Sequence, residues 1–560
     1  MGYNYWNGTE AAHRRVMMKA AGYSDEDIRQ KPHIGIPNSY MAGSPGTAHL
    51  RQVTEAVKEG IWAAGGIPVE FGIPATCGNV ANGADEMKYE QVGRDIVAMS
   101  IEFVSRIHNF DAICCVASCD LIIAGCYLAA CRLDIPALVV TGGSMQAGNY
   151  CGKTVVEADL DAARFSGASE AELFEMEESV CPSFGACPSM GTANTMQMLG
   201  EVLNLVMPGT STIPASDNAR LRAARTAGKY MVQLARSGKT PKDLITKDVL
   251  ENAIMFDMAV AGSTNAVLHI LAYAYELGIK LTLADFEKYA KEIYCINAVI
   301  PSGPYTVVDF HYAGGVKQVM KQLAGKIHTD APTIYGDTTW GELLDSVKSA
   351  PNKVIHSLED PVAKEPGLKI MRGNISPAGA IVRPTAVYEE VKYIKGAAKV
   401  YECDQDAYRA IMAGEIAAGD ILVIRYEGCK GAPGMKELML SIDALIGLGL
   451  DKKVGLITDA RFSGFNYGAI VGHVSPEAYD GGVIALIENG DEIEMDIAGG
   501  TVNLLVSDEI LAERRKSWVR PPLKQQKGVL NIYAQNCRPA EEGGAMQPWA
   551  LDADYGYHHE

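Results

Sequence analysis

The sequence lacks any long apolar segment. No stretch of about 18 uninterrupted apolar residues occurs in its 560 residues, so no membrane-spanning helix is expected. The first 28 residues contain no apolar core of signal-peptide length, and Arg14 and Arg15 precede a run that is amphipathic rather than continuously apolar. We therefore expect a cytoplasmic protein with no membrane partner.

The chain also has fewer basic than acidic residues, and its cysteines lack the spacing typical of zinc sites. Lys and Arg number 50 against 68 Asp and Glu, which gives a net charge of −18. No basic surface is available for a phosphate backbone, so no nucleic-acid partner is expected. The 13 cysteines form no C-x-x-C pair, and most lie between Cys77 and Cys187 instead of being spread as a disulfide framework. A zinc ribbon is therefore disfavoured.

The length of the chain and a change in its segment pattern indicate two domains. A chain of 560 residues is too long for one core, and its 48% hydrophobic content is typical of globular proteins. The first part alternates strands and helices, which predicts an α/β domain with a parallel sheet over residues 1–358. Past Pro351 the segments become short and β-like, which predicts a smaller β-barrel or sandwich over residues 367–560. The Pro-rich, charged segment EDPVAKEPG would link them.

The stretch DAICCVASCD, residues 111–120, organises the first domain. Its apolar run predicts a buried strand, and LIIAGCYLAACRL predicts a helix that begins directly afterwards. Cys119 and Asp120 then lie at the carboxyl end of a strand, where open α/β sheets bind ligands. The amide groups of the helix N-terminus should favour thiolate over thiol at Cys119. Alternatively, Cys119 is one more small buried side chain.

Two further cysteines lie in loops that are too polar for a core. Cys77 belongs to PATCGNVANGADEM, a glycine- and asparagine-rich loop after a predicted strand. Cys187 lies in a Gly/Pro/Ser loop just before an apolar helix predicted to begin near Thr192. Cys187 therefore repeats the placement of Cys119 at the entry to a helix.

Eight motifs, taken together, carry a resemblance to a known family. In chain order they are NSY with PGTAHL, SCD, TGGSM, FGAC with GTANTM, GSTNAVLHILA, RGNISPAGAIV, RYEGCKGAPGMKEL, and ITDARFSG with GHVSPEA. Over residues 33–518 the chain resembles the dihydroxy-acid dehydratase and phosphogluconate dehydratase family. The resemblance implies dehydration of 2,3-dihydroxy acids or sugar acids to 2-keto acids. It also implies an iron-sulfur cluster, often a magnesium ion, an α/β domain with a C-terminal β-barrel, and a homodimer or homotetramer.

The resemblance assigns roles to individual residues. Ser463 matches the family's base, an alkoxide that neighbouring positive charge must stabilise. Asp120 and Glu437 match magnesium ligands, and Cys119 and Cys187 match two cluster ligands. Without the motif, the interpretation of Ser463 as an ordinary turn or helix cap before Gly464 would be favoured.

The sequence departs from the family at four places. Gly78 stands where the family commonly has an aspartate, and Leu121 stands where it has a carbamylated lysine, so two of four expected magnesium ligands are missing. Gly46 replaces the first cluster cysteine of many members. The segment around Phe465, usually Gly-Gly-Thr, would place an aromatic ring near the substrate.

One hypothesis reconciles these differences. Cys77, Cys119 and Cys187 could hold three corners of an iron-sulfur cluster, with [4Fe–4S] favoured over [2Fe–2S], and leave one iron open as a Lewis acid. Magnesium remains possible, but we expect weak binding or none, because Gly78 and Leu121 offer no oxygen ligand.

The expected function is therefore that of a hydro-lyase acting on a small hydroxy acid. Two alternatives stay open at this point. One is a divergent lyase or isomerase that acts on another hydroxy acid. The other is a catalytically inactive paralogue that serves as a binding or scaffold protein. Retention of Ser463, Glu437 and Asp120 favours an enzyme.

Overall fold

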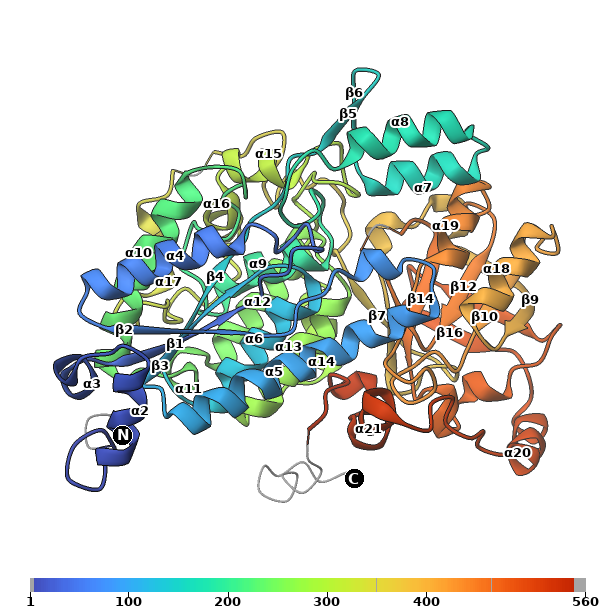
Figure 1. Ribbon diagram of the computed structural model, residues 1–560. Helices are drawn as coiled ribbons and strands as arrows, with labels where there is room; N and C mark the ends of the chain where they lie inside the picture. The colour runs from blue at the N-terminus through green and yellow to red at the C-terminus, as the bar shows by residue number, and fades with distance from the viewer. Residues whose placement is uncertain (1–4, 349, 465, 548–560) are drawn as a thin grey trace.

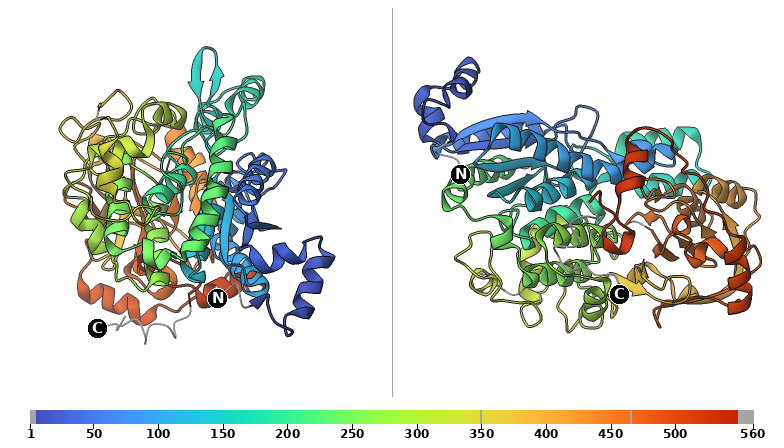
Figure 2. Two further views of the ribbon diagram at one scale, coloured as in Figure 1. Left: turned by 90° about the vertical axis from the view of Figure 1, so that its left-hand side faces the viewer. Right: turned by 90° about the horizontal axis from the view of Figure 1, so that it is seen from below.

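The structure is a computed structural model that describes residues 5–348, 350–464 and 466–547. Figure 1 shows an α/β part, coloured blue to yellow, beside a β-rich part coloured orange. The turned views of Figure 2 show the same two parts side by side and the N-terminal helices at one end of the molecule. No helix of the described residues is both long and apolar enough to cross a membrane.

The α/β part is built on a four-stranded sheet in which every neighbouring pair of strands is parallel. The strand order is β2-β1-β3-β4, so the two central strands lie deepest. Their bounds are β1 His33–Asn38, β2 Ile67–Gly72, β3 Ala112–Ala117 and β4 Ala137–Thr141. The predicted parallel sheet is confirmed.

Helices cover both faces of this sheet because its strands are apolar on both sides. Cys114 packs in a core with helices α4 (Leu50–Ala63) and α10 (Ala219–Ser237). The next residue, Cys115, points the opposite way and packs in a core with α5 (Tyr89–His108) and α6 (Asp120–Leu133). The central strand is thus buried on both faces, as its continuous apolar run predicted.

A second helical layer packs against α6. Helices α9 (Thr192–Val202), α12 (Lys247–Val260) and α13 (Asn265–Leu277) are buried along almost their whole lengths. Helices that are apolar all round belong in the interior of a large domain. These helices support the region at the end of the sheet.

The C-terminal part is an eight-stranded mixed sheet in the order β16-β15-β9-β10-β12-β14-β8-β7. Its two edge strands meet, because Arg372, just after β7, pairs with Thr501 of β16. Apolar side chains fill the interior, so the sheet forms a nearly closed barrel rather than a sandwich. The strands are β7 Lys369–Met371, β8 Gly379–Val382, β9 Tyr393–Tyr401, β10 Ile421–Ile424, β12 Gly455–Thr458, β14 Ala469–Ser475, β15 Glu492–Asp496 and β16 Thr501–Leu504.

Shorter elements complete the fold. The charged segment after β6 forms two helices, α7 and α8, because Ser169 starts a new capping box between them. The remaining α/β elements are α2 Ala12–Ala20, α3 Asp25–Gln30, β5 Gly148–Tyr150, β6 Lys153–Val155, α7 Glu157–Phe165, α8 Glu170–Val180, α11 Pro241–Leu244, α14 Leu283–Tyr289, α15 Val307–Tyr312, α16 Gly315–Gln322 and α17 Trp340–Asp345. The remaining C-terminal elements are α18 Asp404–Met412, β11 Glu437–Leu438, α19 Leu440–Gly447, β13 Arg461–Phe462, α20 Asp508–Ser517 and α21 Gly528–Asn536.

Candidate active site

The junction between β3 and α6 has an unusual backbone. Cys119 is the residue immediately before the helix, as predicted, and its φ is 73°. A residue with a side chain in this region stores strain on the order of 1–3 kcal/mol, which persists only where the surroundings hold the residue in place. The strain supports a functional role for Cys119 over that of a small core filler.

Cys119 is paired with Cys77 of the loop after β2. The Cys77 sulfur accepts a hydrogen bond from the Cys119 thiol and others from the backbone amides of Asn79 and Val80, which lower the pKa of Cys77 to about 7. The same thiol pairing, together with burial, raises the pKa of Cys119. The expectation that the helix N-terminus favours the Cys119 thiolate is therefore wrong, and Cys77 ionises first.

Cys187 brings a third thiol to the same place. The Nδ2 atom of Asn79, two residues after Cys77, lies 3.5 Å from the Cys187 sulfur. Burial and the nearby carboxylate of Glu157 raise the pKa of the Cys187 thiol. Loops that are far apart in the sequence thus bring the predicted cysteines Cys77, Cys119 and Cys187 together.

The missing family cysteine would have belonged to this group. A Cβ atom built on Gly46 would lie 3.1 Å from the sulfur of Cys119. A cysteine at position 46 would therefore adjoin Cys119, as Cys77 does in this chain. Cys77 supplies a thiol from a different loop to the neighbourhood that Gly46 leaves without one.

A short parallel ladder positions Glu437 in the C-terminal part. Strand β11 pairs with β13 so that Glu437 lies opposite Arg461. The Arg461 Nη1 atom donates to Glu437 Oε2 at 3.0 Å, and its Nε atom donates to the Met435 carbonyl oxygen at 2.9 Å. Asn265, at the start of α13, also donates to Glu437 Oε2, at 3.2 Å. The carboxylate is thus held from both parts of the molecule.

Glu90 belongs to this site, although the sequence reasoning missed it. It lies in the first turn of α5, is 9% exposed, and accepts a hydrogen bond from Arg461 Nη2 at 3.0 Å. The guanidinium of Arg461 therefore bridges Glu90 and Glu437. The only signal in the sequence is a carboxylate at the helix entry that ends the Cys77 loop, and carboxylates are common at helix entries.

A small cavity joins most of the predicted residues. Its volume is about 30 Å³, so its polar side chains lie nearly in contact around it. Ser463, which follows β13, is 6% exposed and lines it. The lining residues are Asn79, Asp120, Cys187, Ser189, Gly191, Thr192, Ala193, Asn194, Glu437 and Ser463. Four of the six predicted site residues thus share one cavity, and Cys77 and Cys119 lie beside it.

The surroundings of the carboxyl groups in this region disfavour their ionised form. Burial and the neighbouring charges of Glu90 and Glu437 raise the pKa of Asp120. Burial raises the pKa of Glu437 to about 7, against the opposing effect of Arg461. Leu121 is 3% exposed and adds no oxygen ligand, as expected. The predicted aromatic ring of Phe465 lies outside the described residues.

Other acidic residues of the same motifs hold the backbone. Asp459, in ITDARFSG, accepts hydrogen bonds from the backbone amides of Tyr426, Glu427 and Ala478. It therefore ties the RYEG segment to the segment after β14. Asp459 thus holds the loop that leads to Glu437 in place, which is a structural role.

The buried carboxyl group of Glu427 should make the stability of the fold depend on pH. It is 2% exposed, and burial raises its pKa to about 7 from an ordinary value of 4.5. Between these pH values the folded state keeps a proton that the unfolded chain has released, so stability falls as pH rises. Glu427→Gln should remove this pH-dependent loss of unfolding free energy, which is on the order of 3 kcal/mol. Thermal midpoints of both proteins at pH 5 and pH 8 test this. The thermal midpoint of the variant, relative to that of the wild type, should be higher at pH 8 than at pH 5. An equal difference between the two proteins at both pH values would contradict the prediction.

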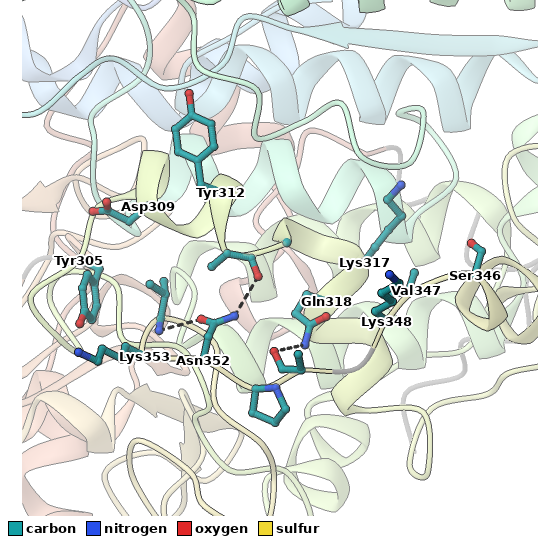
Figure 3. A pocket seen from close by; sticks show the side chains of 15 residues that line it. Tyr305, Asp309, Tyr312, Lys317, Gln318, Ser346, Val347, Lys348, Asn352 and Lys353 are labelled. Carbon is teal, nitrogen blue, oxygen red and sulfur yellow. Dashed lines mark hydrogen bonds between the residues drawn. The ribbon is translucent and has the colours of Figure 1, made fainter.

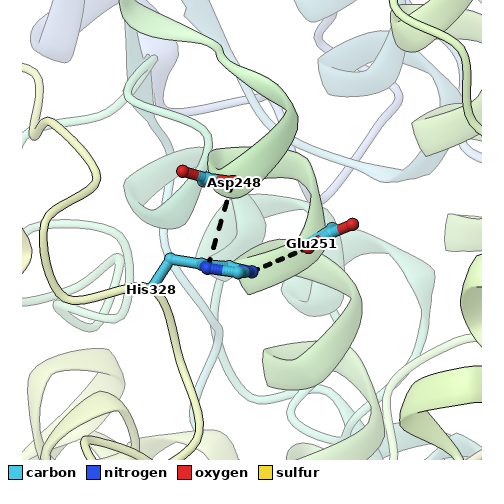
Figure 4. A group of neighbouring side chains, drawn as sticks. All are labelled: Asp248, Glu251 and His328. Carbon is cyan, nitrogen blue, oxygen red and sulfur yellow. Dashed lines mark hydrogen bonds and ion pairs between the residues drawn. The ribbon is translucent and has the colours of Figure 1, made fainter.

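The surface carries a large cavity and a cluster of metal-ligand side chains as well. A cavity of about 880 Å³ lies over α15, α16, residues 346–348 and residues 350–354, and no predicted site residue lines it (Figure 3). Asp248, Glu251 and His328 have ligand atoms within 4.8 Å of one another and could hold a metal ion (Figure 4). Glu251 Oε2, however, already contacts His328 Nε2 at 2.7 Å and the Tyr289 hydroxyl at 2.5 Å.

Comparisons with known proteins identify the family of the chain. Residues 31–342 match the family described as dihydroxy-acid/6-phosphogluconate dehydratase N-terminal, and residues 353–544 match its C-terminal counterpart. The chain is 42% identical over 546 residues to a dihydroxy-acid dehydratase of Caldanaerobacter subterraneus subsp. tengcongensis, covering 96% of this chain and 98% of the relative. It is 43% identical over 545 residues to the dihydroxy-acid dehydratase of Ignicoccus hospitalis, with the same coverage. The chain therefore belongs to the dihydroxy-acid/6-phosphogluconate dehydratase family.

Proposed function

We propose that this chain is a hydro-lyase that converts a 2,3-dihydroxy acid or sugar acid to a 2-keto acid and carries an iron-sulfur cluster. The observation that carries the proposal is the convergence of three thiols beside a cavity lined by Asp120, Glu437 and Ser463. The names of the relatives support dehydration of dihydroxy acids.

The donor set fits an iron-sulfur cluster. Cys77, Cys119 and Cys187 are soft thiol ligands from three loops, and burial together with the carboxylate of Glu157 keeps Cys187 protonated until a metal displaces its proton. Three thiolates suit a [4Fe–4S] cluster, which we favour over [2Fe–2S], because the fourth iron keeps an open position. When bound, such a cluster supplies a Lewis acid for the leaving 3-hydroxyl group.

The carboxylates fit a hard divalent cation. Asp120 and Glu437 face one cavity from different parts of the molecule, and oxygen ligands are those that magnesium prefers. Burial is the main cause of the raised pKa of both groups, and repulsion by neighbouring carboxylates adds to it. A bound cation would remove that penalty and hold the substrate carboxylate beside Ser463.

In this proposal Ser463 would take the C2 proton. Its neighbour Gly464 has its carbonyl oxygen bound by the guanidinium of Arg383, which is 3% exposed. A buried cation bound to the residue next to Ser463 would favour the alkoxide form of its hydroxyl. The electron pair of the C2–H bond would form the C2=C3 bond as the 3-hydroxyl leaves as water, and the enol would take a proton at C3 to give the 2-keto acid.

Iron analysis tests the cofactor. Protein purified without oxygen from a host competent in cluster assembly should be brown and contain iron and acid-labile sulfide in equal amounts, about four of each per chain for [4Fe–4S]. Half that content would favour [2Fe–2S]. Colourless, iron-free protein from the same preparation would contradict the cluster.

A further inference from the structure

Two buried cysteines that are far apart in the sequence, Cys429 and Cys537, lie side by side. Cys429 is 2% exposed and Cys537 is 1% exposed, and both belong to one apolar cluster. The Cys537 thiol donates a hydrogen bond to the Cys429 sulfur. The Cys429 thiol donates in turn to the Met435 sulfur at 3.6 Å. The two thiols are thus already in contact, outside the candidate active site.

Cys429 belongs to a loop that supports the active site. The loop follows β10 and carries Met435, whose carbonyl oxygen accepts from Arg461 Nε at 2.9 Å. The same guanidinium donates to Glu437 at 3.0 Å. The position of Cys429 is therefore coupled, through a short loop, to the position of Arg461.

Cys537 begins a C-terminal hairpin, residues 537–546, whose two ends pair with each other. Two neighbouring side chains of α5 bind the backbone of this hairpin. Arg94 donates to two of its carbonyl oxygens, at 3.1 and 2.9 Å, and Asp95 accepts from one of its amides at 2.8 Å. A covalent bond between Cys429 and Cys537 would therefore tie a segment that is fastened to the α/β part to a loop of the barrel.

A cavity leads to one of the two thiols. Its volume is about 180 Å³, and Cys429 lines it while Cys537 does not. This volume admits molecules of the size of water. Lys430 and Asp480 also line it, and their side chains, paired at 2.7 Å, are 22% and 25% exposed, so the cavity reaches the surface. A small molecule that enters from solvent meets Cys429 first.

We propose that Cys429 and Cys537 are a site of reversible oxidation, at which a small hydroperoxide converts the two thiols to a disulfide. The Cys429 sulfur attacks one oxygen of hydrogen peroxide, the O–O bond breaks, and a sulfenic acid and one water form. The Cys537 sulfur then attacks the Cys429 sulfur, the S–O bond breaks, and a second water leaves. The two thiols give up two electrons and two protons, which reduce the peroxide to water.

The hydrogen bond between the thiols suits this order of events. The bond to Cys429, together with burial, raises the pKa of the Cys537 thiol. Cys537 therefore keeps its proton while Cys429, which accepts the bond and faces the cavity, reacts with the peroxide. Cys537 then serves as the thiol that closes the disulfide.

A second pair of thiols provides a control within the same molecule. Cys115 and Cys126 are fully buried and hydrogen-bonded to each other, but they line neither this cavity nor the one at the candidate active site. They lie inside β3 and α6, whereas Cys429 lies in a loop and Cys537 directly follows α21. A disulfide brings two sulfurs to about 2.0 Å, closer than any hydrogen bond, so the pair outside regular elements can adjust more easily.

Disulfide mapping on the full-length protein tests the proposal. Cluster-loaded protein is treated with hydrogen peroxide, the remaining thiols are blocked with N-ethylmaleimide in denaturant, and the peptides are identified by mass spectrometry. We expect peptides joined through Cys429 and Cys537, about two mass units lighter than the two thiol peptides and separated by dithiothreitol. Oxidation of the exposed Cys151 and Cys181 shows that the dose of peroxide is sufficient. Links among the proposed cluster ligands give other peptides and are counted separately.

Two single variants test the order of attack. Cys537→Ala should trap Cys429 as a sulfenic acid that reacts with dimedone, whereas Cys429→Ala should leave Cys537 as a thiol. Thermal midpoints then compare the oxidised wild type with oxidised Cys429→Ala, so that any damage to a cluster is common to both. The wild type should unfold several degrees higher, because the disulfide closes a loop of about 100 residues in the unfolded chain.

Two outcomes would overturn the proposal. One is that Cys429 and Cys537 stay reduced at a dose of peroxide that oxidises the exposed cysteines. The other is that the control pair in β3 and α6 forms a disulfide to the same extent, which would mean that unfolding rather than the cavity exposes the thiols. Neither measurement needs turnover, so the proposal does not rest on the proposed function.

Discussion

Cys119→Ala is expected to lose the iron-sulfur cluster and the dehydratase activity together. The Cys119 thiol is hydrogen-bonded to Cys77, and Cys187 contributes to its electrostatic environment. Alanine offers no ligand atom, and Gly46 beside it offers none either. Iron, acid-labile sulfide and turnover, measured on anaerobic preparations, should all fall to background.

Cys114→Ala is the matched control for this change. Cys114 lies five residues earlier on β3, is fully buried, and packs with apolar residues on the other face of the sheet. Its replacement should lower stability slightly and leave iron and sulfide unchanged. Retention of a full cluster and full turnover in Cys119→Ala would remove the cysteine from the ligand set.

Ser463→Ala is expected to lower turnover by about two to four orders of magnitude, the usual scale for loss of a general base. Ser463 lines the cavity beside Asp120 and Glu437, and the substitution removes only its hydroxyl. Cluster content and the thermal midpoint should stay close to the wild type. Hydrogen exchange at C2 of the substrate should fall in parallel, because proton abstraction is the step affected.

Ser507→Ala provides a serine control far from the chemistry. Ser507 caps helix α20 by accepting from the Ile510 amide, so its loss should cost about 1 kcal/mol of stability and no activity. Wild-type turnover and C2 exchange in Ser463→Ala would show that another group is the base, and would favour the divergent-lyase alternative.

The β3–α6 junction could be predicted because its signals are local. An apolar run of strand length followed at once by an apolar helix specifies the turn, and the turn places Cys119 at a sheet end. The α/β part and the barrel follow from the same kind of pattern, since the change from helical to short β-like segments occurs within the sequence itself. The turn residues between short strands did not distinguish a barrel from a sandwich, because pairing of Arg372 with Thr501 is a long-range contact.

The rest of the site depends on contacts that leave no periodic signal. Strands β11 and β13 are two residues long each, too short to be recognised, yet their pairing sets Glu437 against Arg461. The close approach of the Glu90 carboxylate to Gly78 is visible only when the two segments are placed together. The hydrogen bond between Cys77 and Cys119, which lowers the pKa of Cys77 and raises that of Cys119, likewise joins two segments whose contact no local pattern indicates.

Formation of a 2-keto acid tests the central claim most directly. Cluster-loaded protein is incubated without oxygen in D₂O with a panel of small 2,3-dihydroxy acids and sugar acids, and the products are followed by NMR. The account predicts that at least one acid loses its C2 proton and yields a 2-keto acid that carries deuterium at C3. Cluster-loaded, folded protein that neither forms a 2-keto acid nor exchanges the C2 proton of any acid in the panel would contradict it.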